Sequence, residues 1–315
     1  MPAITDVPGI QVGHAQDVEA RTGCTVLLGP FRGAADIRGL GTGTREMDTL
    51  SVLHLVPRAN ALLLTGGSAF GLGAADGVMA WLRDRGEGFD VGVARVPIVP
   101  TAVIFDLGVG RADRWPDADM GRAACQAAGT DVAEGAVGAG TGATVGKIAG
   151  PEGAMAGGVG TWSMAAAAVG AVTVGALAVV NALGDVRDDA GRIIAGARGP
   201  DGGFLDAAAL LRSGEGPAAF GRPPSRPSPG ANTTLAVVAT DAPLTRPELH
   251  GLARAASAAL TRRITPANTP FDGDITFALT TADDDGGVGP GGLLALSAVA
   301  THVLERAIER AVTAT

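Results

Sequence analysis

Hydrophobic positions in the first 130 residues alternate between short strand-like runs and longer stripes with helical spacing. Strands are predicted at 24–28, 60–64 and 91–94. Behind the second strand, apolar residues recur every three to four positions over 68–85, and a similar stripe covers 117–128. Both of these segments are therefore predicted to be helices.

The middle of the chain contains a long uncharged segment, 153–184, within which hydropathy alone would assign a membrane span at 165–183. That run consists mainly of Ala, Gly, Thr and Val, and its apolar residues recur at every second position over 172–180. A period of two is typical of a central strand buried on both faces. We therefore predict strands near 154–161 and 165–182, and no membrane span.

The C-terminal part begins after a segment rich in Pro and Gly, 213–231, which is predicted to be an exposed loop or linker. A strand at 232–240 comes directly after it, and a capping box formed by Thr245 and Glu248 opens a helix behind that strand. The other predicted elements are a short helix at 206–212, a strand at 275–280 and a helix at 292–312. Because helices and strands do not alternate one by one, this order favours a layered α+β sandwich over a doubly wound sheet.

Composition excludes several classes of protein. The 315 residues are 46% hydrophobic and 18% charged, which is typical of a folded chain, and we expect a single domain over 1–315. A formal net charge of −8 argues against nucleic-acid binding and against a polybasic membrane anchor. Two cysteines cannot form a disulfide framework, and 1–13 lacks the pattern of a signal peptide. We therefore expect a cytoplasmic protein.

The basic residues are distributed unusually. Of the 24, all are arginines except Lys147, which lies in the Gly-rich run 138–150. Arginine keeps its proton in a protein, whereas a buried lysine can shift its pKa. Lys147 is therefore a candidate for chemistry, and a chance surface lysine is the alternative.

The common cofactor motifs are absent or incomplete. A phosphate-binding loop that ends at Lys147 would need Gly at the position of Thr141 and Ser or Thr at that of Ile148. The four histidines stand apart, and the Gly-x-Ser-x-Gly elbow of serine hydrolases does not occur. We expect no nucleotide, no metal and no other cofactor.

A different kind of nucleophile fits the junction between Asn232 and Thr233. If the backbone breaks there, Thr233 becomes an N-terminal residue with both a hydroxyl nucleophile and a free α-amine. The α-amine has an unperturbed pKa of about 7.7–8.0, so it can accept the hydroxyl proton at neutral pH. An ordinary junction between a loop and a strand is the alternative.

Four further residues support a catalytic interpretation. Asp272 and Asp274 precede the strand at 275–280, and alternate residues of a strand share a face, so both carboxylates can face one site. Lys147 and Asn181 can donate hydrogen bonds where negative charge develops during acyl transfer. Asn181 interrupts an apolar strand, where a buried amide is costly unless it is hydrogen-bonded, and a structural amide is the alternative.

Together, several longer segments resemble the L-aminopeptidase/D-esterase (DmpA-like) family of self-cleaving amide hydrolases, and the likeness covers nearly the whole chain. The segments are ITDVPGIQVGHAQD (4–17), LLLTGGSAFGLGAADGV (62–78), VPIVPTAVIFDL (96–107), GAGTGATVGK (138–147), VVNALGD (179–185), NTTLAVVATD (232–241) and TPFDGDITFALT (269–280). The resemblance implies an αββα sandwich of the N-terminal-nucleophile type. It also implies self-cleavage into an α chain, 1–232, and a β chain, 233–315, which stay associated.

The resemblance also assigns roles and a branch of the family. The nucleophile corresponds to Thr233, and a Thr with an Asp-x-Asp pair is similar to the branch of nylon-oligomer (6-aminohexanoate) hydrolases, whose supporting lysine and asparagine match Lys147 and Asn181. The family's substrate-contacting tyrosine falls at Phe105, so its phenolic hydroxyl is missing here. The expected function is hydrolysis of amide bonds in small peptides or 6-aminohexanoate oligomers through an acyl intermediate on Thr233.

Several alternatives remain open at this stage. One is a β-peptidyl or L-aminopeptidase with D-esterase activity, for which a carboxylate such as Asp106 could recognise the substrate amine. Another is an acyltransferase like the ornithine acetyltransferases, which also cleave themselves before a Thr. A third is a scaffold without enzymatic activity. Gly- and Ala-rich faces that can pack closely favour a homo-oligomer, for which we expect a tetramer.

Overall fold

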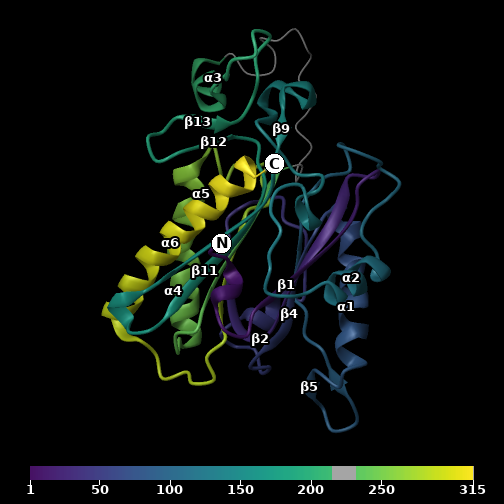
Figure 1. The fold of residues 1–315 in the computed structure, drawn as a ribbon, viewed down its shortest axis with the longest axis vertical. Coiled ribbons are helices and arrows are strands. Elements are labelled where there is room, and N and C mark those ends of the chain that lie inside the picture. The colour runs from purple at the N-terminus through teal and green to yellow at the C-terminus, as the bar shows by residue number, and fades with distance from the viewer. Residues whose placement is uncertain (215–231, 315) are drawn as a thin grey trace.

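The computed structural model describes residues 1–214 and 232–314 and shows four layers, with helices on both sides of a double layer of strands (Figure 1). Nine strands form one sheet, in which eight follow the order β10-β11-β14-β16-β2-β4-β7-β3 and the ninth, β1, pairs with β2. These strands are β1 (Gln11–Asp17), β2 (Thr22–Ile37), β3 (Thr44–Arg45), β4 (Ala59–Thr65), β7 (Thr101–Val103), β10 (Gly158–Ala165), β11 (Thr173–Asn181), β14 (Thr233–Thr240) and β16 (Ile275–Thr280).

The long strand β2 belongs to both layers. Its first part pairs with β1 and β4, its last six residues pair with β16, and the register shifts between Leu28 and Phe31. Large side chains from the two parts of the sheet meet in one buried cluster between the layers. Members of this cluster include Leu27, Phe31, Leu62, Leu64, Leu177, Val179, Leu235, Val237 and Phe277. The double layer therefore encloses the central core.

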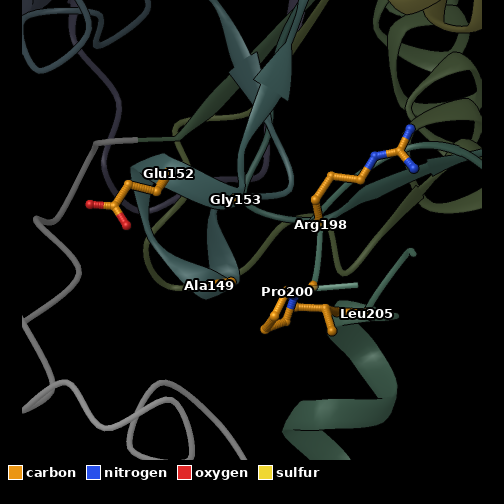
Figure 2. Close-up of a pocket in the computed structure, with 7 residues that line it drawn as sticks. Ala149, Glu152, Gly153, Arg198, Pro200 and Leu205 are labelled. Atoms are coloured by element: carbon orange, nitrogen blue, oxygen red, sulfur yellow. The ribbon is translucent and has the colours of Figure 1, made fainter. Parts of the chain in front are cut away.

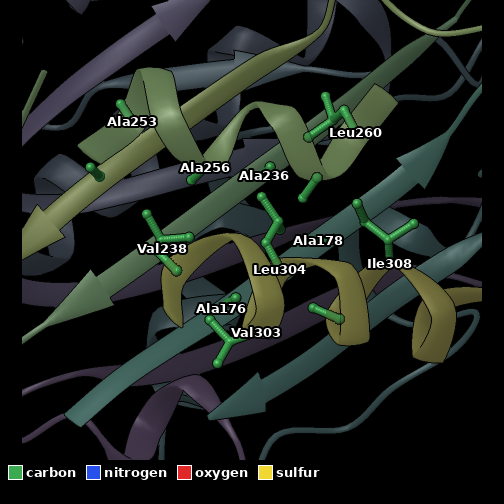
Figure 3. Close-up of a cluster of buried hydrophobic side chains, with 14 of the residues drawn as sticks. Ala176, Ala178, Ala236, Val238, Ala253, Ala256, Leu260, Val303, Leu304 and Ile308 are labelled. Atoms are coloured by element: carbon green, nitrogen blue, oxygen red, sulfur yellow. The ribbon is translucent and has the colours of Figure 1, made fainter. Parts of the chain in front are cut away.

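The outer faces of the two layers are covered by different helices. On one side β11 and β14 present small residues such as Ala176, Ala178 and Ala236 to α4 (Arg246–Ala256), α5 (Ala258–Arg263) and α6 (Gly289–Thr313), as Figure 3 shows. Because alanine side chains are short, the helices pack close to the strands on this face. On the other side, α1 (Ala74–Arg83) and α2 (Ala118–Gln126) cover β2 and β4. The predicted αββα sandwich is confirmed.

The shorter elements lie around this sandwich. The remaining strands are β5 (Phe89–Asp90), β6 (Arg95–Val96), β8 (Thr144–Val145), β9 (Met155–Ala156), β12 (Asp185–Arg187), β13 (Ile193–Ala195) and β15 (Ile264–Thr265). The remaining α-helix is α3 (Ala207–Ser213), and short 3-10 helices are η1 (Ile4–Asp6), η2 (Met47–Leu50), η3 (Ser68–Gly73), η4 (Gly138–Gly140), η5 (Lys147–Ala149), η6 (Pro151–Gly153) and η7 (Ala167–Val169).

Three predicted elements differ from the structure. The segment 91–94 is not a strand but the turn between β5 and β6, closed by a hydrogen bond from Val91 N to Ala94 O. The helix predicted at 68–85 is divided into η3 and α1. The strand predicted at 165–182 starts only at Thr173, because η7 and a tight turn separate it from β10. The linker predicted at 213–231 lies almost entirely outside the described residues.

Helix α6 is, among the described residues, long and apolar enough by length and composition to cross a membrane. This is weak evidence, because the core helix of a globular fold has the same properties. The inner face of α6 contributes Leu296, Ala300, Val303, Leu304 and Ile308 to the buried cluster against the sheet. The run 165–183, the other apolar stretch considered above, contains η7, a turn and the strand β11.

Candidate active site

Thr233 is the first residue of β14, an inner strand of the sheet. Its Cα pairs with that of Asn181 on β11, and on the other side Asn232 pairs with Asp272 just before β16. Each of these residues is at most 2% exposed. Two of the residues that the sequence analysis singled out, Asn181 and Asp272, are thus neighbours of Thr233 and Asn232 because of strand register.

The peptide bond between Asn232 and Thr233 is intact in the structure, which therefore describes the uncleaved form of the chain. The Thr233 hydroxyl Oγ1 lies 2.6 Å from the carbonyl oxygen of Asn232, to which it donates. The same oxygen accepts a second hydrogen bond, from the backbone N–H of Gly273 at 2.8 Å. The hydroxyl is thus held against the carbonyl group that it would attack in self-cleavage.

Asp272 and Asp274 are both buried and are held mainly by backbone N–H groups. Asp274 accepts from Thr234 N at 2.6 Å and from Asn268 N at 2.9 Å, and Asp272 Oδ2 accepts from Thr269 N at 2.6 Å. Asp272 Oδ1 is buried and has no hydrogen-bond partner among the described residues. One carboxylate oxygen close to the junction is therefore available to a new donor.

Neither carboxylate forms a hydrogen bond with the Thr233 hydroxyl within the described part of the chain. Strand parity explains this arrangement. Thr233 lies two residues before Leu235 and is therefore on the strand face toward the core between the layers. Asp274 is in register with Thr234, which is on the opposite face of the strand. The expectation that the two carboxylates hold the Thr233 amine and hydroxyl stays a prediction about the cleaved form.

Lys147 begins the short helix η5, and its amine reaches the end of β11. Its Nζ donates to Asn181 Oδ1 at 2.6 Å and to Asn181 O at 3.0 Å. The preceding residue, Gly146, has φ +70°, and a Cβ there would lie 2.1 Å from the backbone of Gly196 and Ala197. Only glycine fits at this position, so the entry into η5 is fixed by the neighbouring backbone.

Asn181 is fully buried, and its side-chain amide connects three segments. Its Oδ1 also accepts from Thr144 N at 3.1 Å, and its Nδ2 donates to the carbonyl of Phe105 at 3.1 Å. These contacts satisfy the buried amide, so the structural interpretation of Asn181 is supported alongside the catalytic one. Phe105 enters the site through its backbone, and its half-buried ring comes from the segment that follows β7.

Burial shifts the proton affinities of this group in opposite directions. It lowers the pKa of Lys147 to about 7, although the charges of Asp272, Asp274 and Asp106 favour the protonated amine. Burial, and then the negative charge of Asp272, raise the pKa of Asp274 to about 7, and burial also raises the pKa of Asp272. Perturbed groups of this kind cluster at functional sites.

Asp106, which was considered above as a group that recognises an amine, has another use. Its carboxylate is 2% exposed and accepts from the Thr22 hydroxyl and from Gly67 N, both at 2.7 Å. Burial raises its pKa. Because both oxygens are engaged with the protein, Asp106 fixes the loop next to Phe105 and does not present a carboxylate to a ligand.

Sequence reasoning missed two features of this site. The first is Gly273, whose N–H contacts the junction, and the only signal for it was its place between two aspartates. The second is the loop 38–41, where Gly41 N donates to Asp272 O at 2.9 Å and Gly39 N to Asp274 O at 3.2 Å. No local pattern indicates that a loop 230 residues away in the sequence would support the two aspartates.

One pocket of ≈ 340 Å³ lies close to η5, lined by Ala149, Glu152, Gly153, Arg198, Gly199, Pro200 and Leu205. Figure 2 shows the charged ends of Glu152 and Arg198 pointing away from each other, so no two charges converge inside it. Within residues 1–214 and 232–314, no three His, Cys, Asp or Glu side chains are grouped so that they could hold a metal ion.

Comparisons with known proteins identify the family of this chain. The sequence profile described as "Peptidase family S58" matches residues 2–315. An uncharacterized aminopeptidase of Mycobacterium tuberculosis is 47% identical over 301 residues, which covers 89% of this chain and 82% of the relative. A 6-aminohexanoate-oligomer endohydrolase of Kocuria sp. is 30% identical over 317 residues, covering 96% and 84%. The mycobacterial protein is thus more similar than the nylon-oligomer hydrolase, contrary to the branch expected from Thr233 and the Asp-x-Asp pair.

The fold also matches a solved structure. The L-aminopeptidase D-Ala-esterase/amidase of Ochrobactrum anthropi, described as a variant of the N-terminal-nucleophile hydrolase fold, superposes with a TM-score of 0.75 at 21% identity. The match covers 99% of this chain and 86% of that one. At this identity the likeness concerns the fold.

Proposed function

The chain belongs to peptidase family S58 and is an amide hydrolase with the N-terminal-nucleophile fold, and on that premise we propose that it cleaves itself between Asn232 and Thr233 and then acts as an aminopeptidase. The observation that carries this proposal is the position of the Thr233 hydroxyl, 2.6 Å from the carbonyl oxygen of Asn232. The hydroxyl is buried against the bond that it would break.

Self-cleavage begins with an attack of Thr233 Oγ1 on the carbonyl carbon of Asn232. The C–N bond breaks, an ester links the two residues, and water then hydrolyses this ester. Lys147 acts as the proton acceptor for the hydroxyl, because burial lowers its pKa to about 7 and leaves part of the amine neutral at physiological pH. Its anchor, Asn181, is the residue paired with Thr233 across the sheet.

In the cleaved enzyme, the α-amine of Thr233 takes over as the base for its own hydroxyl. Asp272 Oδ1, which is buried without a partner in the uncleaved chain, receives this new amine. Lys147 and the Asn181 amide are the donors for negative charge on the substrate carbonyl. The two chains stay associated because β14 lies inside the sheet, hydrogen-bonded to β11 and to β16.

The comparisons support the proposed substrate class. The 47% identity to a protein named an aminopeptidase supports small peptides with a free amine as substrates. Oligoamides of 6-aminohexanoate are a second candidate, favoured by the 30% identity to an endohydrolase of such oligomers together with Thr233 and the pair of Asp272 and Asp274.

Intact-mass measurement and N-terminal sequencing of the purified protein test self-cleavage. We expect two chains, one of which begins with Thr233. The variant Thr233→Ala should remain a single chain without amidase activity. The matched control is Thr234→Val, because Thr234 is the neighbouring buried threonine and its hydroxyl has no partner in the described residues. A wild-type chain that stays whole through long incubation would refute the proposal.

Rates on two sets of amides separate the substrate classes. Aminoacyl-anilides and dipeptides with a free amine should be cleaved faster than their N-acetylated forms, whereas an endohydrolase of oligoamides would be indifferent to N-acetylation of a long oligomer. Faster cleavage of blocked 6-aminohexanoate oligomers than of free dipeptides would reverse the assignment.

A further inference from the structure

The backbone N–H of Gly273 donates a hydrogen bond to the carbonyl oxygen of Asn232, next to the bond that is cleaved. We propose that the N–H group of Gly273 stabilises the oxyanion that forms on Asn232 while Thr233 cleaves its own peptide bond, and that a side chain is excluded at residue 273 to leave room for the attacking hydroxyl. This inference rests on the self-cleavage proposed above. It adds a positioning and stabilising role for a residue between the two aspartates.

The distances suit an oxyanion donor. Gly273 N lies 2.8 Å from the carbonyl oxygen of Asn232, within the range of about 2.7–3.1 Å expected for such donors. The Thr233 hydroxyl approaches the same carbonyl group. When Oγ1 bonds to the carbonyl carbon, negative charge develops on an oxygen that an N–H dipole already faces in the uncleaved chain.

The donor is fixed on both sides. The peptide unit between Asp272 and Gly273 continues the parallel pairing of β14 and β16, since Asn232 and Asp272 form a bridge. From the opposite side, Gly41 N donates to the Asp272 carbonyl at 2.9 Å. A donor held in this way cannot turn away as the charge develops, and this rigidity is what makes a dipole effective in catalysis.

The absence of a side chain at residue 273 has a direct steric reason. A Cβ at Gly273 would lie 2.6 Å from Thr233 Oγ1 and 3.0 Å from Gly41 O. The φ angle of Gly273 is not in the left-handed region, so the backbone conformation itself is open to other residues. The requirement for glycine is therefore set by the space that the nucleophile occupies.

The step needs no reactant other than water. The Oγ1–C bond forms, the C–N bond breaks, and the proton of the hydroxyl ends on the departing nitrogen of Thr233. The Gly273 N–H keeps its proton and contributes only its dipole. Hydrolysis of the ester then returns the hydroxyl to Thr233 and leaves a carboxylate on Asn232.

Replacing the N–H group by an ester oxygen tests the role of the donor. Cell-free synthesis of the full chain with glycolic acid at residue 273 removes this N–H and adds no side chain. We expect self-cleavage to slow by about 10²–10³-fold, the usual loss for one oxyanion donor. Intact mass separates cleavage before Thr233 from hydrolysis of the introduced ester.

A matched control lies at the other end of the same strand pair. Thr281 N donates to Thr240 O at 3.0 Å, and the corresponding α-hydroxy acid at residue 281 removes an equivalent hydrogen bond far from the junction. Self-cleavage should keep its wild-type rate in this control. Equal rates for the two ester proteins, or a slow control, would overturn the inference.

Hydroxylamine identifies the step that is affected, because it cleaves esters but not peptide bonds. Because hydroxylamine would also cleave the ester introduced at residue 273, this test uses Gly273→Ala, in which hydroxylamine should not restore cleavage before Thr233 if Gly273 acts in the attack. Restored cleavage would place the defect in ester hydrolysis and would overturn the proposed role. If instead the wild-type chain is never cleaved, the proposed function fails, and the rate comparison is not needed to reject the inference.

Two further measurements do not depend on the ester proteins. Gly273→Ala keeps the N–H but crowds Oγ1, so its self-cleavage should slow at least tenfold, whereas Gly291→Ala, where a Cβ meets nothing within 4 Å, should cleave normally. A crystal structure of full-length Thr233→Ala should place Gly273 N 2.7–3.1 Å from Asn232 O. Normal cleavage of Gly273→Ala, or a distance above 3.5 Å, would overturn the inference.

Discussion

Two of the groups of buried charge in the described part of the chain are built in different ways. One contains Lys147, Asp272 and Asp274 at the end of the sheet. The other joins α5 to α6 through Arg263, Glu305 and Glu309, each of which is at most 8% exposed. Both groups place two carboxylates near one basic residue, but only the first includes residues predicted to be catalytic.

The partners of the carboxylates differ between the two groups. In the group between α5 and α6, called the helix group below, Arg263 Nη2 donates to Glu305 at 3.2 Å and its Nε lies 2.8 Å from Glu309. Arg262 also donates to Glu305, at 3.1 Å, and Arg306 donates to Glu309 at 2.6 Å. In the group of Lys147, Asp272 and Asp274, called the sheet group below, backbone N–H groups hold the carboxylates, and Lys147 donates to Asn181.

This difference shows how a chain can hold one buried charge group inert and another reactive. Guanidinium ions keep their protons, so the helix group is a fixed ion-pair network. Backbone dipoles compensate a buried charge less completely, and the pKa values of Lys147 and Asp274 both move to about 7. Lys147 is the single lysine among the 24 Lys and Arg residues, and burial lowers its pKa to about 7, whereas the arginines of the helix group keep their protons.

The largest expected effect comes from replacing the lysine of the sheet group by arginine, the basic residue of the helix group. Lys147→Arg keeps a positive charge but removes a base, so self-cleavage should slow by about 10²–10⁴-fold, the contribution of general acid–base catalysis. The measurement is the rate of appearance of the chain that begins with Thr233. Arg263→Lys is the reciprocal control and should be processed normally. Rapid cleavage of Lys147→Arg would show that Lys147 is not the base.

The next effect concerns stability instead of rate. Arg263→Met leaves Glu305 and Glu309 buried with one partner fewer, and breaking a buried ion pair in this way costs about 3–5 kcal/mol. We expect the lower end of this range, because Arg262 and Arg306 still contact the two glutamates. Urea unfolding gives the free energy, and the amidase rate well below the transition should equal that of wild type. A stable variant with lost activity would link this network to the site.

A smaller effect appears when pH is varied. Raising the pH through about 7 converts Lys147 to its neutral form and Asp274 to its ionised form, so both groups become better proton acceptors. Self-cleavage of freshly synthesised chain should therefore rise up to about tenfold per pH unit below 7 and level off above about 8. Arg263→Lys should show the same pH profile of self-cleavage. In Lys147→Arg, the rise in rate that comes from deprotonation of the lysine should be lost. A rate that falls above pH 7 would indicate that the protonated lysine is required.

Much of the sandwich could be predicted because its strands carry a clear period of two. The strand predicted at 275–280 is β16 to the residue, and the alternation in β14 sends Leu235 and Val237 to the core between the layers and Ala236 and Val238 toward the helices. The failures have physical reasons. The run 91–94 contains Gly92, whose positive φ angle of 85° belongs to the turn between β5 and β6. The uncharged, Ala-rich composition of 165–182 hid the break at η7.

The site was predictable residue by residue but not in its arrangement. Thr233, Lys147 and Asn181 stood out because each is an exception in its segment, and register brings the first and last together. The hydrogen bond from Gly273 N to Asn232 O and the hydrogen bonds from the loop 38–41 to the two aspartates involve backbone groups. Every residue carries such groups, so no side-chain pattern could reveal these hydrogen bonds. The structure likewise shows that each carboxylate oxygen of Asp106 accepts a hydrogen bond from the protein, which its sequence position does not indicate.

The smallest expected effect comes from the residue at which the chain departs from its family's pattern. Phe105 already touches the sheet group through its carbonyl, which accepts from Asn181 Nδ2, so Phe105→Tyr adds a hydroxyl to a ring whose backbone is fixed beside the site. One new hydrogen bond to the substrate contributes about 0.5–1.5 kcal/mol, so amidase activity should rise by about two- to tenfold, with stability unchanged. Phe204→Tyr is the control, because that ring packs against Arg198 outside both charge groups. Equal rates for Phe105→Tyr and wild type on every amide tested would mean that the ring does not reach the substrate. The missing hydroxyl would then have no effect on the substrate preference of this protein.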